Sequence, residues 1–265
     1  MFTVPLITVS QVEIFFLVLM RIGGMVFMVP IFNDKAVPLL LKTGITLLLA
    51  MIMYPFVSAH QAPPPLLAGG LPAVLVAVVR EMGVGISVGF MAAMLLAAVQ
   101  TAGQFMGFQM GFSIVNVIDP VSSVQVSIIA QFQYLVALLV FLAVGAHRWF
   151  IRAMYDSFSL IPLAGFHLTD DLLQVLYRYS SNIFVIAVKL GAPLMVALLL
   201  CNVILGILAR TVPQMNIFIV GYPLQIGLGL LVLAFSMPYM LAVFRGMYFD
   251  LFRDVFWLLQ ASGSG

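Results

Sequence analysis

Long apolar runs separated by short polar breaks dominate this chain. The runs cover about residues 12–32, 39–59, 73–99, 120–146, 179–209 and 216–243. Each is at least as long as the roughly 20 apolar residues that a helix needs to cross the hydrocarbon core of a bilayer. The pattern therefore predicts an all-α integral membrane protein built from helical hairpins.

The polar stretches between these runs do not fit a plain alternation of spans. Lys and Arg residues occur in 33–42, in 147–178 and after residue 243. Such cations mark cytoplasmic segments, yet alternating spans cannot place all of these stretches on one side. We therefore expect broken helices and a re-entrant loop, in a chain that sits inside a larger assembly.

The segment 100–118 differs from the apolar runs around it. It lies in the uncharged stretch between Glu81 and Asp119, but residues 100–112 mix glycine, glutamine, methionine and phenylalanine. Irregular backbone at membrane depth survives only where protein buries it or where it lines a water-filled cavity, because lipid offers the amides no hydrogen bonds. We therefore expect an irregular functional segment here, in place of an ordinary helix.

The glycines of this segment allow two interpretations. Gly103, Gly107 and Gly111 recur every four residues, which is the spacing of a close helix-packing face. Alternatively, they let a loop bend while soft phenylalanine and methionine side chains project into a pore, since methionine is flexible and polarizable. The residues alone leave both interpretations open.

Composition and charge agree with a membrane protein and exclude several other classes. The 265 residues are 64% hydrophobic and 8% charged, with a mean hydropathy of +1.20. Soluble domains carry about 25% charged residues. The net charge of +2 is too small to indicate nucleic-acid binding.

The two ends of the chain bear on how it is divided. No Lys or Arg precedes Arg21, so the basic start of a signal peptide is missing and we expect the first run to stay in the mature protein. Residues 261–265 have the composition of a flexible tail or an added linker. We therefore treat residues 1–260 as a single membrane-associated helical unit.

Ionisable residues inside apolar runs are candidate functional groups. Arg21 and Lys189 lie within such runs, and Arg210 lies at the edge of one, where a snorkelling cation is the simpler explanation. Arg80 and Glu81 are neighbours in the sequence and do not face each other on a helix. We therefore do not expect them to form a pair.

Two further residues mark the end of the irregular segment. Asp119 followed by Pro120 is typical of an N-cap and the first residue of a helix. This capping role accounts for the Asp119 carboxylate and leaves little for a proton relay.

Motifs of catalysis and metal binding are missing from the sequence. His60, His147 and His167 have no second metal ligand at helical spacing, and Cys201 lies in an apolar run as a buried small hydrophobe. No nucleotide-binding loop, zinc-protease motif or nucleophile elbow occurs. We expect no enzyme activity, no metal and no cofactor.

Two blocks of the sequence resemble a known family. Residues 101–112 (TAGQFMGFQMGF), followed by Asp119-Pro120, and residues 210–223 (RTVPQMNIFIVGYP) are similar to the FliR family, an export-gate subunit of the flagellar type III secretion apparatus. Length, hydropathy and the order of the blocks also agree, so the resemblance covers essentially the whole chain. A flagellar member is favoured over the related virulence injectisomes.

The resemblance implies a place in a hetero-oligomeric channel of the bacterial inner membrane, in the flagellar basal body. Members of the family assemble with FliP and FliQ, are contacted by FlhB and FlhA, and help unfolded flagellar proteins cross the membrane. FliR itself resembles a FliP-like and a FliQ-like element joined in one chain. A gate complex raised toward the periplasm would explain why the cations fit no simple topology.

The resemblance also implies roles for individual residues. A plug loop over about residues 106–122 closes the channel, with plug side chains Phe105, Met106, Phe108, Met110 and Phe112. Its hinges would be Gly103, Gly107 and Gly111, and its anchor Asp119 and Pro120. Arg210, Pro213 and Gln214 would shape a helix break or a subunit contact. The family supplies no catalytic residue.

Two other classes remain as alternatives from the residues. In a secondary transporter for a small solute, segment 100–118 would be the broken helix at a midplane site, but few carboxylates are available for coupling. The glycine spacing alone would also permit a membrane anchor that only packs against its neighbours. Dependence on co-expressed partner subunits favours the export gate over the transporter.

Overall fold

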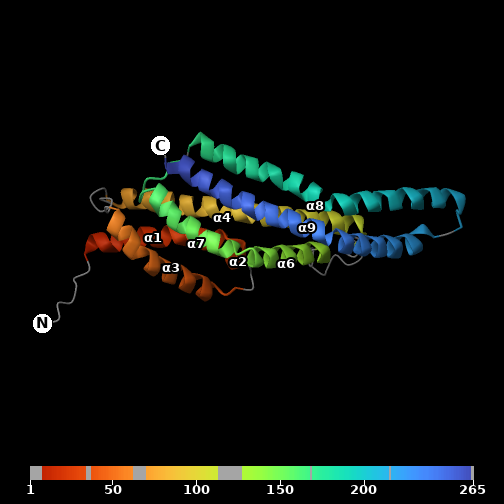
Figure 1. Cartoon of the computed structure of the whole chain (residues 1–265), viewed down its shortest axis with the longest axis horizontal. Helices are drawn as coiled ribbons and strands as arrows, with labels where there is room; N and C mark the ends of the chain where they lie inside the picture. The colour runs from red at the N-terminus through yellow and green to blue at the C-terminus, as the bar shows by residue number, and fades with distance from the viewer. Residues whose placement is uncertain are drawn as a thin grey trace. The chain divides into compact units, whose positions relative to one another are not determined.

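The computed structural model describes residues 8–33, 37–61, 70–112, 127–167, 169–214 and 216–263, and within them it contains helices and no strand (Figure 1). The helices are α1 (Val9–Met28), α2 (Pro30–Asn33), α3 (Leu39–His60), α4 (Gly70–Gln109), α6 (Ile128–Ala143), α7 (Ala146–Leu160), α8 (Asp170–Thr211) and α9 (Ile217–Gly263). The prediction of an all-α membrane protein is therefore confirmed.

The helices are long and apolar enough to cross a membrane. Among the described residues, α1, α3, α4, α8 and α9 each qualify as a span, and α6 with α7 qualifies as one further, bent span. Helices α4, α8 and α9 contain 40, 42 and 47 residues. At 1.5 Å per residue they reach about 60–70 Å, roughly twice the thickness of a bilayer core.

The segment expected to be irregular begins later than the sequence indicated. Residues 100–109 continue α4 without interruption, and a turn follows at residues 110–112. The prediction of non-helical backbone from residue 100 onward is wrong for these ten positions, because a glycine-rich helix can pack closely against protein. Asp119 and Pro120, with the rest of the predicted plug loop beyond Phe112, lie outside the described residues.

The chain divides into two compact units. Unit 1 comprises Met1–Met94, Gly145–Tyr179 and Phe249–Gly265, and unit 2 comprises Leu95–Val144 and Ser180–Tyr248. The hydropathy pattern, which indicated one helical unit over 1–260, contains no sign of this division. In unit 1, α9 continues through Ala261 and Ser262 to Gly263, into the residues assigned to a tail.

Unit 1 is built around α1, which lies beside α3 (Figure 1). Its buried side chains recur every three to four residues and form an apolar stripe interrupted by Arg21. Helix α4 approaches α1 so closely that a Cβ added at Gly85 would overlap the carbonyl oxygen of Arg21. Two backbones in such contact fix the spacing and register of the two helices.

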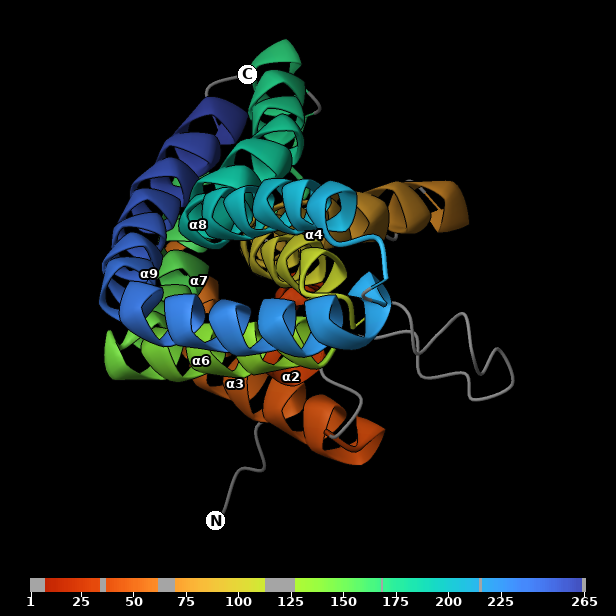
Figure 2. The ribbon, with the colours of Figure 1, turned by 90° about the vertical axis from the view of Figure 1, so that its right-hand side faces the viewer.

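Unit 2 combines the end of α4 with α6 and with parts of α8 and α9. Helices α8 and α9 run antiparallel, and the turn between them faces the viewer in Figure 2. Polar contacts join these helices, since Tyr239 donates to the carbonyl oxygen of Lys189 at 3.3 Å. The buried Tyr248 hydroxyl of α9 donates to the Ala137 carbonyl of α6 at 2.7 Å.

Candidate functional site

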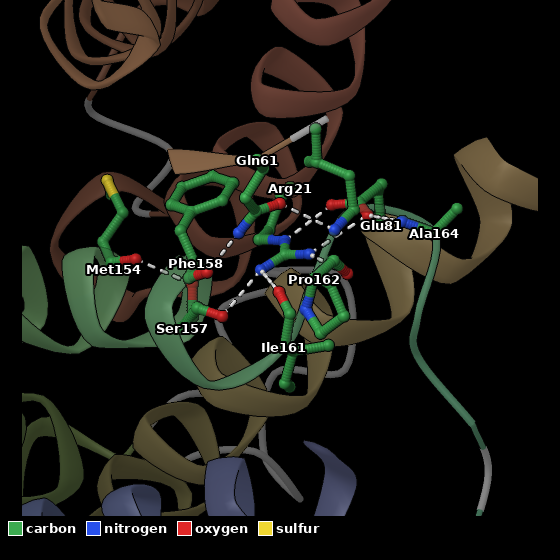
Figure 3. A network of polar contacts seen from close by, with 10 residues as sticks. Arg21, Gln61, Glu81, Met154, Ser157, Phe158, Ile161, Pro162 and Ala164 are labelled. Carbon is green, nitrogen blue, oxygen red and sulfur yellow. Dashed lines mark hydrogen bonds and ion pairs between the residues drawn. The ribbon is translucent and has the colours of Figure 1, made fainter. Parts of the chain in front are cut away.

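A fully buried ion pair lies in unit 1, between the middle of α1 and α4 (Figure 3). Arg21 Nε is 2.6 Å from Glu81 Oε2, and Arg21 Nη2 donates to Glu81 Oε1 at 3.1 Å. Both side chains are 0% exposed. Two parallel hydrogen bonds between a guanidinium and a carboxylate form the strong, geometrically specific type of pair.

The other donors of Arg21 hold the end of α7. Nη1 donates to the carbonyl oxygens of Ser157 at 2.8 Å and Ile161 at 3.0 Å, and Nη2 to that of Pro162 at 3.3 Å. A guanidinium has five N–H donors, and all five are used. The last carbonyls of a helix lack partners within the helix and favour a nearby cation, so Arg21 caps α7.

An aromatic ring completes the surroundings of the guanidinium. Its central carbon lies 4.4 Å from the centroid of the Phe158 ring, within the range of a cation–π interaction. Phe158 is itself 1% exposed. The positive charge is therefore shielded from water on this side as well.

Glu81 and Gln61 fix the connection that follows α7. The Ala164 N–H donates to Glu81 Oε1 at 2.7 Å, and the Leu163 N–H donates to Gln61 Oε1 at 2.9 Å. The Gln61 amide donates in turn to the Phe158 carbonyl. Ala164 has φ +58°, a left-handed conformation that costs about 1–2 kcal/mol for a residue with a Cβ. These side-chain contacts stabilise it.

The sequence identified one member of this pair and missed the other. The sequence pattern marks Arg21 as a candidate intramembrane charge, and it gives Glu81 only as the neighbour of Arg80, with which no pair is expected. Arg80 instead donates to the Ala164 carbonyl at 2.9 Å. A buried charge without a partner is strongly unfavourable, so a search for the carboxylate that Arg21 requires could have identified Glu81.

The other charges singled out from the sequence do not join a buried network in the described part of the chain. Lys189 and Arg210 are both exposed, and neither forms an ion pair with a described residue. Because every donor of Arg21 is used, its guanidinium has no hydrogen bond to offer a ligand. Its chemistry is that of a structural lock.

The second candidate site is the C-terminal end of α4, in unit 2. The Phe112 N–H donates to the Gly107 carbonyl and the Gly111 N–H to the Phe108 carbonyl, both at 3.1 Å. Gly111 has φ +87°. These features form a Schellman motif with glycine at the C′ position. Gly111 therefore ends α4 and turns the chain away from the helix axis.

Two methionines fasten this end to the neighbouring helices. Met106 and Met110 are both 0% exposed. A Cβ added at Gly229 of α9 would lie 2.7 Å from Met110 Cγ, and one added at Gly191 of α8 would lie 3.7 Å from Met106 Cγ. These contacts of the two methionines are van der Waals contacts with glycine positions of α8 and α9.

The predicted plug side chains are not equivalent in the structure. Met106 and Met110 face the interior of unit 2, Phe108 is 71% exposed, and Phe105 and Phe112 are half-buried. Nearby, Gln109 Oε1 and Ser127 Oγ are buried atoms without a hydrogen-bond partner among the described residues. The segment thus combines an inward methionine pair with an outward phenylalanine.

The three glycines predicted as hinges also differ from one another in the structure. Gly103 and Gly107 lie within regular helix and face Ala130 and Ser127 at the start of α6, where an added Cβ would overlap the neighbouring atoms. The packing interpretation therefore describes these two glycines. Gly111 alone has the backbone conformation that glycine favours.

Residues of the second sequence block lie at the tip of the α8–α9 hairpin. Helix α8 ends at Thr211, immediately after Arg210, and Pro213 and Gln214 lie in the turn before α9. A cavity of about 260 Å³ opens between the two helices. It is lined by Asn202, Leu205, Gly206, Ala209, Gly221, Tyr222 and Gln225. No cluster of three metal-ligating side chains occurs within the described ranges.

Comparison with known proteins extends over nearly the whole chain. The family described as bacterial export proteins, family 1, matches residues 12–251. The flagellar biosynthetic protein FliR of Bacillus subtilis (strain 168) is 38% identical over 237 residues, which cover 88% of this chain and 90% of that protein. The FliR proteins of Escherichia coli (strain K12) and Pectobacterium carotovorum are 30% and 28% identical, over 92% and 96% of this chain and 92% and 97% of those proteins.

Proposed function

The chain belongs to the bacterial export proteins, family 1, and on this premise we propose that it forms part of a gated channel for flagellar proteins. The flagellar relatives and the candidate spans make it a multi-pass inner-membrane subunit of the flagellar export apparatus. The gate is the further step. In this proposal, the end of α4 closes the path of unfolded proteins.

The contacts at the end of α4 support this role. Met106 and Met110 are fully buried, beside Gly191 and Gly229, and fully burying a methionine stabilises by about 1.5–3 kcal/mol. Two such side chains give a closure of a few kcal/mol, the size of a conformational equilibrium that a partner or substrate can shift. A passing polypeptide can replace these contacts because they have no fixed direction.

The exposed faces of the long helices support an assembly with other subunits. In the most apolar windows, 61% of the residues of α4 are buried, but only 28% of those of α8 and 22% of those of α9. Large apolar surfaces mark contacts with protein or lipid. We propose FliP-like and FliQ-like subunits as the neighbours that cover part of this surface, with FlhB and FlhA attached and lipid on the remainder.

Photo-crosslinking from the end of α4 tests the gate. A crosslinking amino acid replaces Phe108, which is 71% exposed, in cells that hold a stalled export substrate. The matched control is Leu40 in α3, which is 85% exposed and lies in the other unit. We expect substrate adducts from position 108 and none from position 40. If position 108 gives no substrate adduct in an export-competent complex, the proposal is contradicted.

A second measurement separates an export gate from a solute transporter. A transporter would act as a single chain and be stabilised by its ligand. The gate predicts that the chain becomes monodisperse only with co-expressed FliP-like and FliQ-like subunits, because its apolar faces need partners. Size-exclusion chromatography of the chain with and without these subunits gives the answer. A stable, monodisperse chain on its own favours the transporter.

A further inference from the structure

We infer that Gly229 is a receptor notch for Met110, with Met106 packed beside Gly191, and that this methionine latch sets how easily the end of α4 leaves its closed position. The inference rests on the proposed gate and specifies what holds the gate shut. The latch consists of these four residues. It joins the end of α4 to α8 and α9, entirely within unit 2.

The contact at Gly229 is the tightest part of the latch. A Cβ at this position would lie 2.7 Å from both Cγ and Cε of Met110 and 3.0 Å from its Sδ. The whole outer part of the side chain therefore lies along the glycine. Any residue other than glycine at 229 would force Met110 to move.

A comparison within α9 shows that this glycine is required by its neighbour. Gly227 precedes it by two residues on the same helix, and a Cβ there would meet no described residue within 4 Å. Glycine in a helix interior is about 1 kcal/mol less favourable than alanine. At Gly229 the side chain of Met110 supplies the reason for that cost, whereas at Gly227 nothing in the described part of the chain does.

The other methionine of the latch packs beside a glycine of a different helix. Met106 lies one helical turn before Met110, so both project from the same side of α4. A Cβ at Gly191 of α8 would lie 3.7 Å from Met106 Cγ, an ordinary van der Waals contact, and the tighter neighbour there is Sδ of Met195 at 3.1 Å. Both latch methionines are 0% exposed. One side of α4 is thus fastened to both helices of the hairpin.

The latch also controls the direction in which the chain leaves α4. Met110 directly precedes Gly111, whose left-handed conformation ends the helix. Tyr222 of α9 abuts Gly111, with a ring carbon 2.8 Å from an added Cβ. Withdrawal of Met110 from its notch therefore shifts the turn itself. The exit of the chain from α4 moves with the methionine.

The first experiment substitutes the notch and its neighbour in the assembled gate complex. Gly229→Ala is expected to raise the ion leak across the inner membrane about fivefold, a change of about 1 kcal/mol in closure. Gly227→Ala, which meets open space, is expected to leave the leak unchanged. Co-purification with the partner subunits confirms assembly in each case. Equal leaks from the two variants would overturn the inference.

A methionine truncation covers the case in which Gly229→Ala does not assemble. Met110→Ala empties the notch without adding an atom and is expected to raise the leak to a similar extent. Met240→Ala is the matched control, because Met240 is also 0% exposed in unit 2 but contacts Gln133 of α6. If both truncations leak equally, the effect is one of general packing and the latch is wrong.

A cysteine pair tests whether release of the latch is needed for export. Met110→Cys with Gly229→Cys, in a Cys201→Ala background, places two thiols across the notch. Oxidation to the disulfide should stop export and keep the leak at the wild-type level, and reduction should restore export. Export that continues through the oxidised complex overturns the latch.

The outcomes of these tests distinguish the latch from the gate itself. If position 108 crosslinks to substrate but the complex with the oxidised cysteine pair still exports, the channel role is supported and the latch is wrong. If no substrate reaches position 108 in an export-competent complex, the proposed gate falls, whatever the cysteines do.

Discussion

The Arg21–Glu81 network and the methionine end of α4 hold their helices by opposite means. The first uses charges, fixed geometry and five occupied donors in a fully buried place. The second uses two flexible thioethers that lie against glycines. A network of directional bonds loses much when one member is removed. Apolar contacts can be exchanged for others, so a lock and a releasable closure need different chemistry.

Removal of the buried cation should have the largest effect in either region. Arg21→Met leaves the buried Glu81 carboxylate without its positive partner, and we expect a loss of about 3–5 kcal/mol in stability. The measurement is the thermal stability of the detergent-solubilised complex, together with the amount of chain in membranes. The double variant Arg21→Met with Glu81→Met removes both charges and should recover part of the loss. If Arg21→Met is as stable as the wild type, the Arg21–Glu81 network does not lock these helices together.

Crowding the backbone contact between α1 and α4, beside the Arg21–Glu81 pair, should lower the stability somewhat less. In Gly85→Ala, the new Cβ overlaps the Arg21 carbonyl, and helix backbone cannot move aside as a side chain can. We expect a loss of about 1–3 kcal/mol in the same thermal assay. The control is Gly44→Ala in α3, where an added Cβ meets nothing within 4 Å. Equal stability of the two variants would contradict a close α1–α4 contact.

A change at Gly111, the glycine that ends α4, should destabilise the protein less than the changes at Arg21 and Gly85. Gly111→Ala places a Cβ on a residue with φ +87°, at a cost of about 1–2 kcal/mol. Hydrogen exchange of the amides in residues 105–112 should report the loosening locally. Gly246→Ala, at an open position of α9 in the same unit, should leave this exchange unchanged. Full protection in Gly111→Ala would argue against the Schellman turn.

The smallest effect on stability is expected at the exposed phenylalanine. Phe108 is 71% exposed, so Phe108→Ala should change stability by no more than about 0.5 kcal/mol. It should nevertheless alter the rate of flagellar protein export, measured by secretion into the medium. Leu40→Ala, at a position that is 85% exposed, is the control. A normal export rate in Phe108→Ala would mean that this side chain has no part in the passage of substrates.

Much of the helical architecture could be predicted from local pattern. The apolar runs correspond to helices of the structure because a buried or lipid-facing helix needs a long apolar sequence. The end of α4 was harder to place. Glycine and glutamine suggested irregular backbone from residue 100, whereas Gly103 and Gly107 lie in regular helix against α6. A GxxxG spacing has the same form in a packed helix and in a bendable loop.

The amino-acid sequence alone determined that the chain is helical, that it belongs in a membrane and which family it resembles. These properties depend on composition and on residues that are close in the sequence. The tertiary structure decided which charge meets Arg21 and which glycine receives a methionine. Arg21 and Glu81 are separated by 60 residues, and Met110 and Gly229 belong to different helices. Burial and close packing depend on neighbours in space, and only the folded chain brings those neighbours together.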